Sequence, residues 1–524
     1  IKTKKIINKY FSINKKLFKK KYSSSKNNEI LVEFNGFQVN HTGLAAMSNV
    51  LAKKFNAKIN GYIGYSFVVS PLKYNTARTI KWFLGNFLNL KTFKIYRSFN
   101  TDKIFKPNIN KETAIEAEKI FKKIWPKIKK KDDILKIKLR GIYLGDLIYD
   151  TYIKANFLPT IDINDPKFKT YFHDFLELFI FWYTYFKNHN VKAIIASHPV
   201  YTYALPLRIA ARFKALAYVL DIEHFFQITE KNLYQLSDCK DYKKTAKSLS
   251  KFQLKKGKIE AKNKLLQRIS GEEGLKIDYP ELQKSAFHNK SFKPMIKKNN
   301  KIKILICTHE YFDAPHIFGK NLFPDFYEWM ECLGKISDET PDYDWYIKTH
   351  PPQPGKYKIY QPLNTILVKE FVKKYKNIKL LPDTYSHKQI IKEKINFVLT
   401  TYGSVAFEYP LFNIPVIMAT KNHTHRLYDF ITTPRSQKEY IDTIKNLKDL
   451  NCKINKEEIY EYYYIRFIKN GSLNWMVDYS RAIKKFKYWS AMFSNKFYEF
   501  YMNEFKQKKF KYTSKKYLEY INSN

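Results

Sequence analysis

The stretch that most constrains the fold covers residues 400–415, with the sequence TTYGSVAFEYPLFNIP. Short apolar runs stand on both sides of it, at residues 396–400 and 416–420, and such runs are typical of buried parallel strands. Gly403 and Ser404 predict a tight turn after the first run, and the residues that follow, 405–411, predict a short helix. The stretch therefore predicts a strand–helix–strand unit of a parallel sheet.

The same turn also predicts a binding site for an anion. A helix that starts at the end of a strand presents backbone N–H groups and the positive end of its dipole, and a phosphate is the usual occupant. Glu408 follows about one helical turn later, where a carboxylate can contact the hydroxyls of a sugar or a ribose. The alternative is that Ser404 only caps the helix and Glu408 is solvated, because such turns occur in many α/β proteins.

Strands and helices alternate along most of the chain, which predicts an α/β protein with two doubly wound, Rossmann-like parallel-sheet domains that face a cleft. The length of 524 residues also exceeds what a single core accommodates. The expected parts are a basic N-terminal arm (1–27), a first α/β domain (28–225), a helical linker region (226–300), a second α/β domain (301–480) and basic aromatic helices at the C-terminus (481–524).

The formal net charge of +46 admits several classes of partner. Nucleic acid, an anionic membrane surface and phosphorylated substrates would each be attracted by such an excess of cations. The alternative is a genome-wide preference for residues with A/T-rich codons, since Lys, Asn, Ile, Tyr and Phe are abundant. The four cysteines show no C-x-x-C spacing, which argues against a disulfide framework and a zinc knuckle.

Both ends of the sequence combine cations with aromatic residues. Residues 1–27 contain ten lysines and no acid, which is typical either of a peripheral membrane arm or of a frayed terminus. In the C-terminal part, aromatic residues recur at helical spacing, which predicts either a face packed on the protein's own core or an interfacial membrane helix. These residues are Phe486, Trp489, Phe493, Phe497 and Phe500. No apolar run is long enough for a membrane span, and no secretory signal is apparent.

In the first domain, strands are expected at residues 29–34, 59–69, 94–96, 191–196 and 215–220. His41 is expected in the loop after the first strand, before a helix that starts near residue 44. The G-x-G-x-x-G fingerprint of dinucleotide sites is absent from this loop. Asp146 follows a glycine among aromatic residues, and His198 follows the strand at 191–196. Each of the three is a candidate base, although a loop histidine or a helix-capping aspartate is the more ordinary interpretation.

In the second domain, three loops are expected at the carboxyl ends of strands, which meet along one edge of a doubly wound sheet. Their side chains and helix-start amides suit a nucleotide ester, with cations and amides for the phosphates and a carboxylate for the ribose. The candidates for this site are Thr308, His309, Lys348, His350, Pro351, Gly403, Ser404 and Glu408. No motif requires a bound metal, because a P-loop, a D-x-D pair and H-E-x-x-H are all absent.

Four short motifs resemble the C-terminal half of GT-B glycosyltransferases, and most closely that of bacterial capsule polysaccharide synthesis proteins, which include Kdo transferases. The motifs are KTHP (348–351), LPD (381–383), TYGSVAFE (401–408) and NIPV (413–416). The resemblance covers residues 301–420 and implies that His350, with Pro351, and Ser404 bind the donor phosphate, while Glu408 binds the nucleotide sugar. UDP-N-acetylglucosamine 2-epimerases and CDP-glycerol glycerophosphotransferases share the turn–helix pattern.

The resemblance implies a metal-independent glycosyltransferase, without a cofactor, that builds a capsule-like cell-surface polysaccharide. Its partners would be a CMP- or UDP-linked donor bound by the second domain and a glycan or glycolipid acceptor bound by the first. An inverting reaction needs a base within about 3 Å of the acceptor hydroxyl, for which we rank His41 first, Asp146 second and His198 third; a retaining reaction needs none.

The expected location is the cytoplasm, including the inner face of the cell membrane. One alternative is a glycerophosphotransferase or a UDP-sugar 2-epimerase on the same fold. Another is a non-enzymatic basic protein that binds nucleic acid or membrane, although no nucleic-acid recognition motif is present and no such partner is expected.

Overall fold

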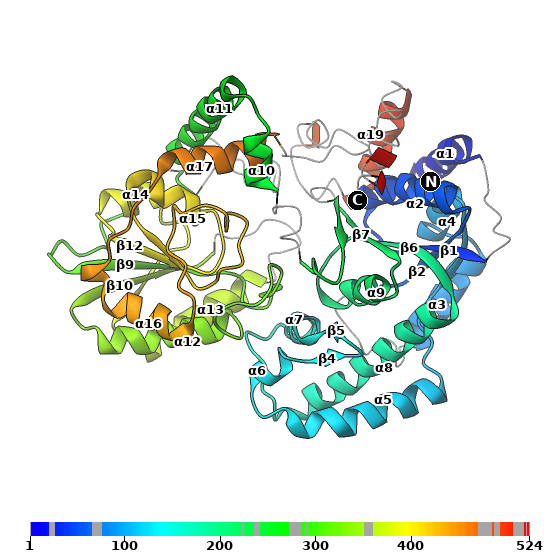
Figure 1. Cartoon of the computed structure of the whole chain (residues 1–524), viewed down its shortest axis with the longest axis horizontal. Helices are drawn as coiled ribbons and strands as arrows, with labels where there is room; N and C mark the ends of the chain where they lie inside the picture. Colours follow the sequence, from blue (N-terminus) through cyan, green and yellow to red (C-terminus); the bar gives the residue numbers. More distant parts are fainter. Residues whose placement is uncertain are drawn as a thin grey trace. The chain divides into compact units, whose positions relative to one another are not determined.

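The computed structural model divides into two compact units (Figure 1). Unit 1 comprises Ile1–Asn156, Ile161–Asp238 and Ser472–Asn524, and unit 2 comprises Phe157–Thr160 and Cys239–Gly471. The structure describes residues 2–19, 27–64, 76–221, 225–234, 241–271, 286–288, 292–350, 360–469, 485–486, 493–506, 518–519 and 521–522.

Unit 1 is built on a six-stranded sheet with the order β3-β2-β1-β6-β7-β8. All neighbouring strands are parallel except β8, which runs antiparallel to β7 at one edge. The strands are β1 (Asn28–Glu33), β2 (Lys58–Tyr62), β3 (Thr101–Phe105), β6 (Asn190–Ala196), β7 (Leu216–Leu220) and β8 (Phe225–Ile228). β1 and β6 are buried along nearly their whole length, as central strands of a doubly wound sheet must be.

The described part of unit 1 also contains α-helices and a small hairpin, β4 (Lys138–Leu139) and β5 (Ile142–Tyr143). α2 packs against β1 and β6, and α9 packs against β6 and β7. The helices are α1 (Lys2–Leu17), α2 (Gln38–Phe55), α3 (Thr76–Phe87), α4 (Thr92–Ser98), α5 (Lys111–Ile124), α6 (Lys131–Ile134), α7 (Gly145–Asn156), α8 (Pro166–Asn188), α9 (Tyr201–Arg212) and α19 (Asn495–Lys506).

The helices nearest the two ends of the sequence, α1 and α19, pack on each other. Tyr10 of α1 is fully buried, with its ring centroid 4.5 Å from that of Tyr498 and 5.1 Å from that of Tyr501. Its hydroxyl group lies 3.3 Å from Thr42 Oγ1 of α2. Residues 2–17 of the lysine-rich segment therefore form a helix that buries Tyr10 inside the protein, while Phe11 is half-buried.

The aromatic stripe of the C-terminal part also faces inward where the structure describes it. Phe497 and Phe500 of α19 are buried, and Phe493 is half-buried against Phe37. Trp489 lies outside the described residues. These contacts favour the interpretation that the stripe packs on the protein's own core.

Unit 2 contains a five-stranded, fully parallel sheet with the order β11-β10-β9-β12-β13. The strands are β9 (Ile302–Cys307), β10 (Tyr343–Lys348), β11 (Ile378–Leu381), β12 (Phe397–Thr400) and β13 (Val416–Met418). Alternate residues of β9 enter two different cores: Ile304 and Ile306 pack with α12, α13 and α16, whereas Leu305 and Cys307 pack with α14 and α15. Helices therefore cover both faces, as in a doubly wound fold.

The helices of unit 2 begin at the polar residues that local capping chemistry favours. Ser250, Asp325, Ser386 and Ser436 each accept a hydrogen bond from a backbone N–H group of the first helical turn. The helices are α10 (Tyr242–Lys247), α11 (Lys251–Ser270), α12 (Phe326–Glu339), α13 (Tyr360–Lys374), α14 (His387–Lys392), α15 (Val405–Glu408), α16 (Gln437–Lys445) and α17 (Lys456–Tyr463).

The two parallel sheets confirm the expected α/β class with two doubly wound units. Several local expectations were wrong, among them the strand at 59–69, because β2 ends at Tyr62 and residues 63–64 lie outside it. Residues 94–96 lie in helix α4 instead of a strand, α2 begins at Gln38, before His41, and α15 ends at Glu408, where a 3-10 turn (Tyr409–Phe412) follows. Among the described residues, no helix has both the length and the apolar character that crossing a membrane requires.

Candidate functional site

In unit 2 the strand order reverses between β9 and β12, the two strands at its centre. In open α/β sheets, ligands bind outside the carboxyl ends of the strands at such a reversal. Thr308 and His309 follow β9 directly, and Gly403 and Ser404 follow β12. The topology therefore brings two of the predicted loops to the same place, and the hydrogen bonds show how they are joined.

His309 holds the turn after β12 in shape. Its Nε2 accepts a hydrogen bond from the backbone N–H of Tyr402 at 2.9 Å and lies 3.2 Å from Thr400 Oγ1. Gly403 has a φ of +110°, in the region that only glycine enters without strain, and a Cβ added there would lie 3.5 Å from His309 Cε1. Burial lowers the pKa of His309 to about 3, with a smaller contribution from nearby His350. The His309 ring is therefore neutral and serves as a fixed acceptor.

Lys348 joins the third loop to this edge. Its backbone oxygen accepts a hydrogen bond from Thr308 N at 3.2 Å, and its buried ammonium group donates to the backbone oxygen of Asp383 at 2.8 Å. Burial lowers the pKa of Lys348, while Cys307 and Asp383 raise it. The direct partner of the ammonium group is therefore a neutral backbone carbonyl, which leaves its other N–H groups available to an anion.

Glu408 lies near the same edge but is not open to solvent. Its Oε1 accepts a hydrogen bond from Arg268 Nε of α11 at 2.5 Å, and both side chains are buried. The sequence gives no sign of this partner, because Arg268 lies 140 positions earlier in the region expected to be a linker. The Glu408 carboxylate is therefore fixed by Arg268, and a sugar that contacted Glu408 would also contact the guanidinium group.

The remaining predicted residues of unit 2 are less constrained. His350 is half-buried and close enough to His309 to affect its pKa. Ser404 is half-buried and, among the described residues, makes no side-chain cap to α15. Pro351 lies outside the described residues. Because α15 has only four residues, the expected contribution of a helix dipole is small, and the cations must supply most of the attraction for an anion.

Three buried polar groups on this edge were missed from the sequence. Thr401 Oγ1, His423 Nδ1 and His425 Nδ1 have no hydrogen-bond partner among the described residues. Thr401 follows β12, and the two histidines follow β13, so both segments leave the carboxyl ends of neighbouring strands. An unpaired buried polar group is costly, and groups of this kind mark places where a ligand or water supplies the missing bond. The signal that could have found them is that Thr401 directly follows one apolar run and the two histidines lie in the loop after the next.

In unit 1, the strand order reverses between β1 and β6. His41 lies near this reversal, but both of its ring nitrogens are engaged. Nε2 donates to the backbone oxygen of Asn35 at 2.8 Å, so Nδ1 is the acceptor of the Tyr498 hydroxyl at 2.6 Å. Burial lowers the pKa of His41 to about 4. This geometry connects α2 to α19 and leaves no nitrogen of the ring to receive a substrate proton.

Asp146 is also fully engaged. Its two carboxylate oxygens accept hydrogen bonds from Nη1 and Nη2 of Arg208, each at 2.6 Å, and the pair is buried. Asp146 Oδ1 additionally accepts from the backbone N–H of Leu147 in the first turn of α7. Both carboxylate oxygens are thus used within the protein, so this geometry favours the ordinary interpretation of Asp146 as a structural residue.

His198 differs from both, because one of its nitrogens is oriented by a chain of hydrogen bonds. The Ser197 hydroxyl donates to Glu33 Oε2 at 2.8 Å and lies 2.7 Å from His198 Nδ1. Since the hydroxyl proton is used by Glu33, Nδ1 carries the proton of the ring and donates to Ser197 Oγ. Among the described residues, Nε2 has no hydrogen-bond partner. Glu33 ends β1 and His198 follows β6, so this series of hydrogen bonds connects the two strands between which the strand order reverses.

Glu33 is the residue of unit 1 that sequence analysis missed. It is fully buried, and its carboxylate accepts hydrogen bonds from Ser197 N at 2.6 Å and Asn35 Nδ2 at 3.2 Å. Burial raises the pKa of Glu33, while His198, Ser197 and Asn35 oppose that shift. A signal was present, because the strand at 29–34 places an acid among apolar residues at its carboxyl end.

One group of potential metal ligands occurs among the described residues, and it lies away from both sheet edges, on α8. Its members are His173, Asp174 and Glu177, whose ligand atoms lie within 4.8 Å of one another. His173 Nε2 is 3.0 Å from Glu118 Oε2 of α5 and His173 Nδ1 is 3.7 Å from Glu177 Oε1. The histidine is thus already paired with carboxylates of two helices, an arrangement that also stabilises the α5–α8 contact without a metal.

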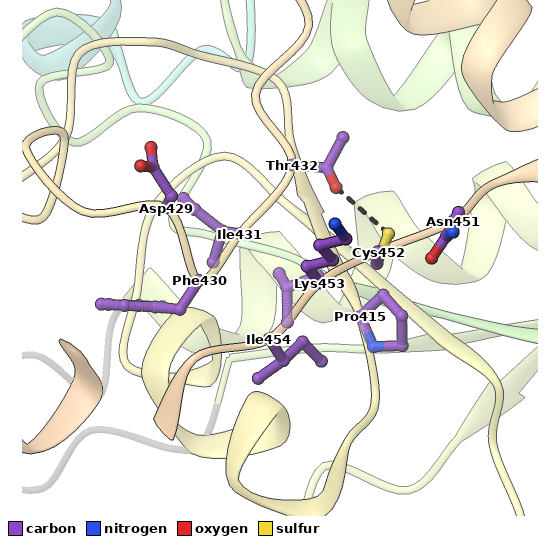
Figure 2. Close-up of a pocket in the computed structure, with 10 residues that line it drawn as sticks. Pro415, Asp429, Phe430, Ile431, Thr432, Asn451, Cys452, Lys453 and Ile454 are labelled. Atoms are coloured by element: carbon purple, nitrogen blue, oxygen red, sulfur yellow. Dashed lines mark hydrogen bonds between the residues drawn. The ribbon is translucent and has the colours of Figure 1, made fainter. Parts of the chain in front are cut away.

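Unit 2 contains a cavity of about 330 Å³. Figure 2 draws the residues that line it. Pro415 and Val416 at the start of β13 contribute to its wall, and Thr432 Oγ1 lies 3.4 Å from Cys452 Sγ on another side. The cavity thus lies at the amino ends of the parallel strands, whereas Thr401 and Gly403 lie at the carboxyl ends. None of the predicted site residues lines this cavity.

Comparison with known proteins gives only distant likenesses. No protein-family model and no curated protein sequence matches the chain. Solved structures that it matches include UDP-GlcNAc 2-epimerase from Neisseria meningitidis bound to UDP-GlcNAc, with 9% identity, a TM-score of 0.25 and coverage of 84% of this chain and 99% of that one. An O-GlcNAc transferase mutant from Thermobaculum terrenum has 10% identity, a TM-score of 0.24 and coverage of 91% and 68%. UGT2 from Phytolacca americana, complexed with UDP-2fluoro-glucose and pterostilbene, has 11% identity, a TM-score of 0.22 and coverage of 85% and 94%. Values as low as these assign no activity to the chain.

The buried, neutral His41 predicts a specific dependence of stability on pH. In the unfolded chain this histidine takes up a proton near pH 6.5, but in the folded chain only near pH 4. Its contribution is therefore complete above pH 6.5 and is lost as the pH falls toward 4, by roughly 3 kcal/mol in total. Urea denaturation at a series of pH values gives the free energy of unfolding of unit 1. Between pH 6.5 and pH 4, this free energy should fall less steeply for His41→Gln than for wild type. The half-exposed His189→Gln is the control, and equal slopes for His41→Gln and wild type would contradict the prediction.

The pair of Arg268 and Glu408 predicts a non-additive pair of substitutions. Arg268→Met leaves a buried carboxylate without its partner and should lower the free energy of unfolding of unit 2 by about 3–5 kcal/mol. Adding Glu408→Gln removes that charge and should restore part of the loss. Lys258→Met, which removes a more exposed partner of Glu457, should cost less than about 1 kcal/mol. A double variant no more stable than Arg268→Met alone would show that the two side chains do not depend on each other.

Proposed function

We propose that the chain is a glycosyltransferase of the GT-B type, which takes a sugar from a nucleotide-linked donor and adds it to a glycan or glycolipid acceptor. Unit 2 would bind the donor and unit 1 would bind the acceptor. The observation that carries the proposal is the carboxyl edge of unit 2, at the reversal of strand order. There Thr308 N donates to Lys348 O, and His309 Nε2 accepts from the N–H of Tyr402, the residue before Gly403.

The chemistry of that edge fits a phosphoester leaving group. When the bond between the sugar carbon and the phosphate oxygen breaks, the nucleotide leaves with the electron pair and its negative charge grows. Lys348 ends β10 at this carboxyl edge and is buried, and His350 is a half-buried imidazole two residues later. Both groups are in place before the reaction, so stabilising the phosphate requires little rearrangement. The proposal therefore needs no metal.

The acceptor side fits an inverting reaction with His198 as the base. The acceptor hydroxyl attacks the sugar carbon and gives its proton to Nε2, while Nδ1–H stays bonded to Ser197 Oγ. Glu33, through Ser197, fixes which nitrogen is available and offsets the positive charge that develops on the ring. Of the three candidate bases, His198 therefore replaces His41 as the first choice, because His41 and Asp146 have no unengaged atom for the proton.

The more specific role, the assembly of a capsule-like surface polysaccharide from a CMP- or UDP-linked sugar, is supported by the motifs at 348–351, 401–408 and 413–416. A cytoplasmic location, where such donors are made, goes with it. A UDP-sugar 2-epimerase or a glycerophosphotransferase would use the same donor edge. Product analysis with CMP-, UDP- and CDP-linked donors separates these activities.

Substitution of Lys348 should weaken donor binding selectively. Nucleotides and their sugars can be screened by the thermal shift that they cause, since a ligand at 100 times its Kd adds about 2.7 kcal/mol of stability. With the best ligand, Lys348→Met should lose most of this shift. The matched control is Lys303→Met, another buried lysine of the same sheet, whose ammonium group donates to the backbone oxygens of Asn299 and Lys301 beside the start of β9. Loss of the shift in both variants, or in neither, would refute a donor site at the carboxyl edge.

Substitution of His198 should affect turnover without affecting donor binding. His198→Gln is expected to lower kcat about 10²–10⁴-fold, the usual contribution of a general base, with the thermal shift by the donor unchanged. Ser197→Ala should cause a smaller loss. His189→Gln, at the other end of β6, is the control. If His198→Gln keeps full turnover with inversion at the sugar carbon, His198 is not the base, and retention of configuration would favour a mechanism without one.

A further inference from the structure

A single face of α3 carries most of a concentrated group of exposed apolar side chains in unit 1. Ile80, Phe83, Leu84 and Phe87 follow one another at spacings of three, one and three residues, and Leu88 and Leu90 continue the group in the turn after the helix. Their exposed fractions run from 49% to 86%, with Phe87 the most exposed. Soluble monomers rarely keep so many large apolar side chains together in water, so the group indicates a contact surface.

The opposite face of α3 is fixed to the protein, which holds the apolar face outward. Arg97 of α4 donates from Nη1 to Asn86 O at 2.8 Å and from Nη2 to Asn86 Oδ1 at 2.6 Å. The amide of Asn86 donates to Ile104 O of β3 at 3.3 Å, and the ring of Trp82 packs edge-on against Phe93. The helix thus cannot turn its apolar residues inward without breaking these contacts.

The segment that contains this face carries charge of one sign, and the first acid after it is the exposed Asp102 of β3. The sequence from residue 34 to residue 101 contains no Asp or Glu. Lys81 and Lys91 are exposed beside the apolar residues, and the ammonium group of Lys106 lies 5.2 Å from the ring centroid of Phe83. Apolar residues flanked by lysines are the combination that binds the interface of an anionic bilayer, where the rings enter the acyl boundary and the cations contact the headgroups.

The fully buried aromatic residues of α1 and α19 are not available for this role. In the part of the chain that the structure describes, Tyr10 of α1 and Phe497 of α19 are fully buried. We therefore propose that α3, with the turn that follows it, is a docking surface for an anionic phospholipid membrane. The proposal does not depend on the proposed function. It places the contact on α3 instead of on the basic ends that the sequence suggested.

Sedimentation with lipid vesicles tests this surface on the full chain. Wild type should bind vesicles of phosphatidylcholine and phosphatidylglycerol more tightly than vesicles of phosphatidylcholine alone, and salt should weaken the difference. Phe83→Ser with Phe87→Ser should weaken binding about tenfold or more. The matched control is Phe252→Ser with Ile259→Ser, two exposed apolar residues of α11 in unit 2, and it should bind as wild type does.

A second pair of variants tests the charges. Lys81→Ala with Lys91→Ala should remove most of the preference for phosphatidylglycerol, whereas Lys262→Ala with Lys264→Ala on α11 should not. Unchanged thermal denaturation would show that the variants are folded. The proposal is overturned if wild type does not bind anionic vesicles, or if the α3 and α11 variants lose binding equally. It is also overturned if Phe83→Ser with Phe87→Ser changes the oligomeric state while vesicle binding stays the same.

Discussion

The parallel pairing of strands is the constraint on which the other features depend. Because consecutive strands run in the same direction, each connection must return along a face of the sheet, and right-handed crossovers place helices on both faces. Where the strand order reverses, the loops on either side diverge and leave room at the carboxyl edge. In unit 2 this occurs between β9 and β12, and in unit 1 between β1 and β6. The candidate side chains gather at these two places because backbone geometry leaves space there.

Burial then determines what each of these side chains can do. His41, His309 and His198 all lie near a strand-order reversal, but their hydrogen bonds give them different properties. His41 uses both nitrogens within the protein, and His309 uses one nitrogen to hold a backbone turn. His198 uses Nδ1 for a chain that ends at a buried carboxylate. A histidine near a sheet edge is therefore informative only when the partners of both ring nitrogens are known.

The sequence predicted the parts of the fold that depend on local pattern. The apolar runs that became β9, β10, β12 and β13 are short and uninterrupted, and the turn at Gly403 requires a residue that tolerates positive φ. Residues 94–96 misled the prediction because Ile95 and Tyr96 have high strand propensity, whereas the contacts with α1 and α2 that stabilise helix α4 are not visible in the local sequence.

The candidate site could be predicted only in part, for a similar reason. Strand ends identified the loops, but the partners that set the chemistry lie far away in the sequence. Arg268 is 140 residues from Glu408, Glu33 is 164 residues from Ser197, and Tyr498 is 457 residues from His41. Periodicity within a short window carries no information about such pairs. The order of the candidate bases changed once these contacts were known.

The contact of α19 with α1 and α2 has a consequence for how the protein is made. Unit 2 is almost continuous in sequence, whereas unit 1 is completed only by the segment Ser472–Asn524. A ribosome therefore synthesises all of unit 2 before it releases the helix that covers Tyr10 and pairs with His41. During translation, the later unit can reach its native state while the earlier one still exposes an aromatic surface, the reverse of the usual N-terminal-first order. Chaperones that act on nascent chains would meet unit 1 in that incomplete form.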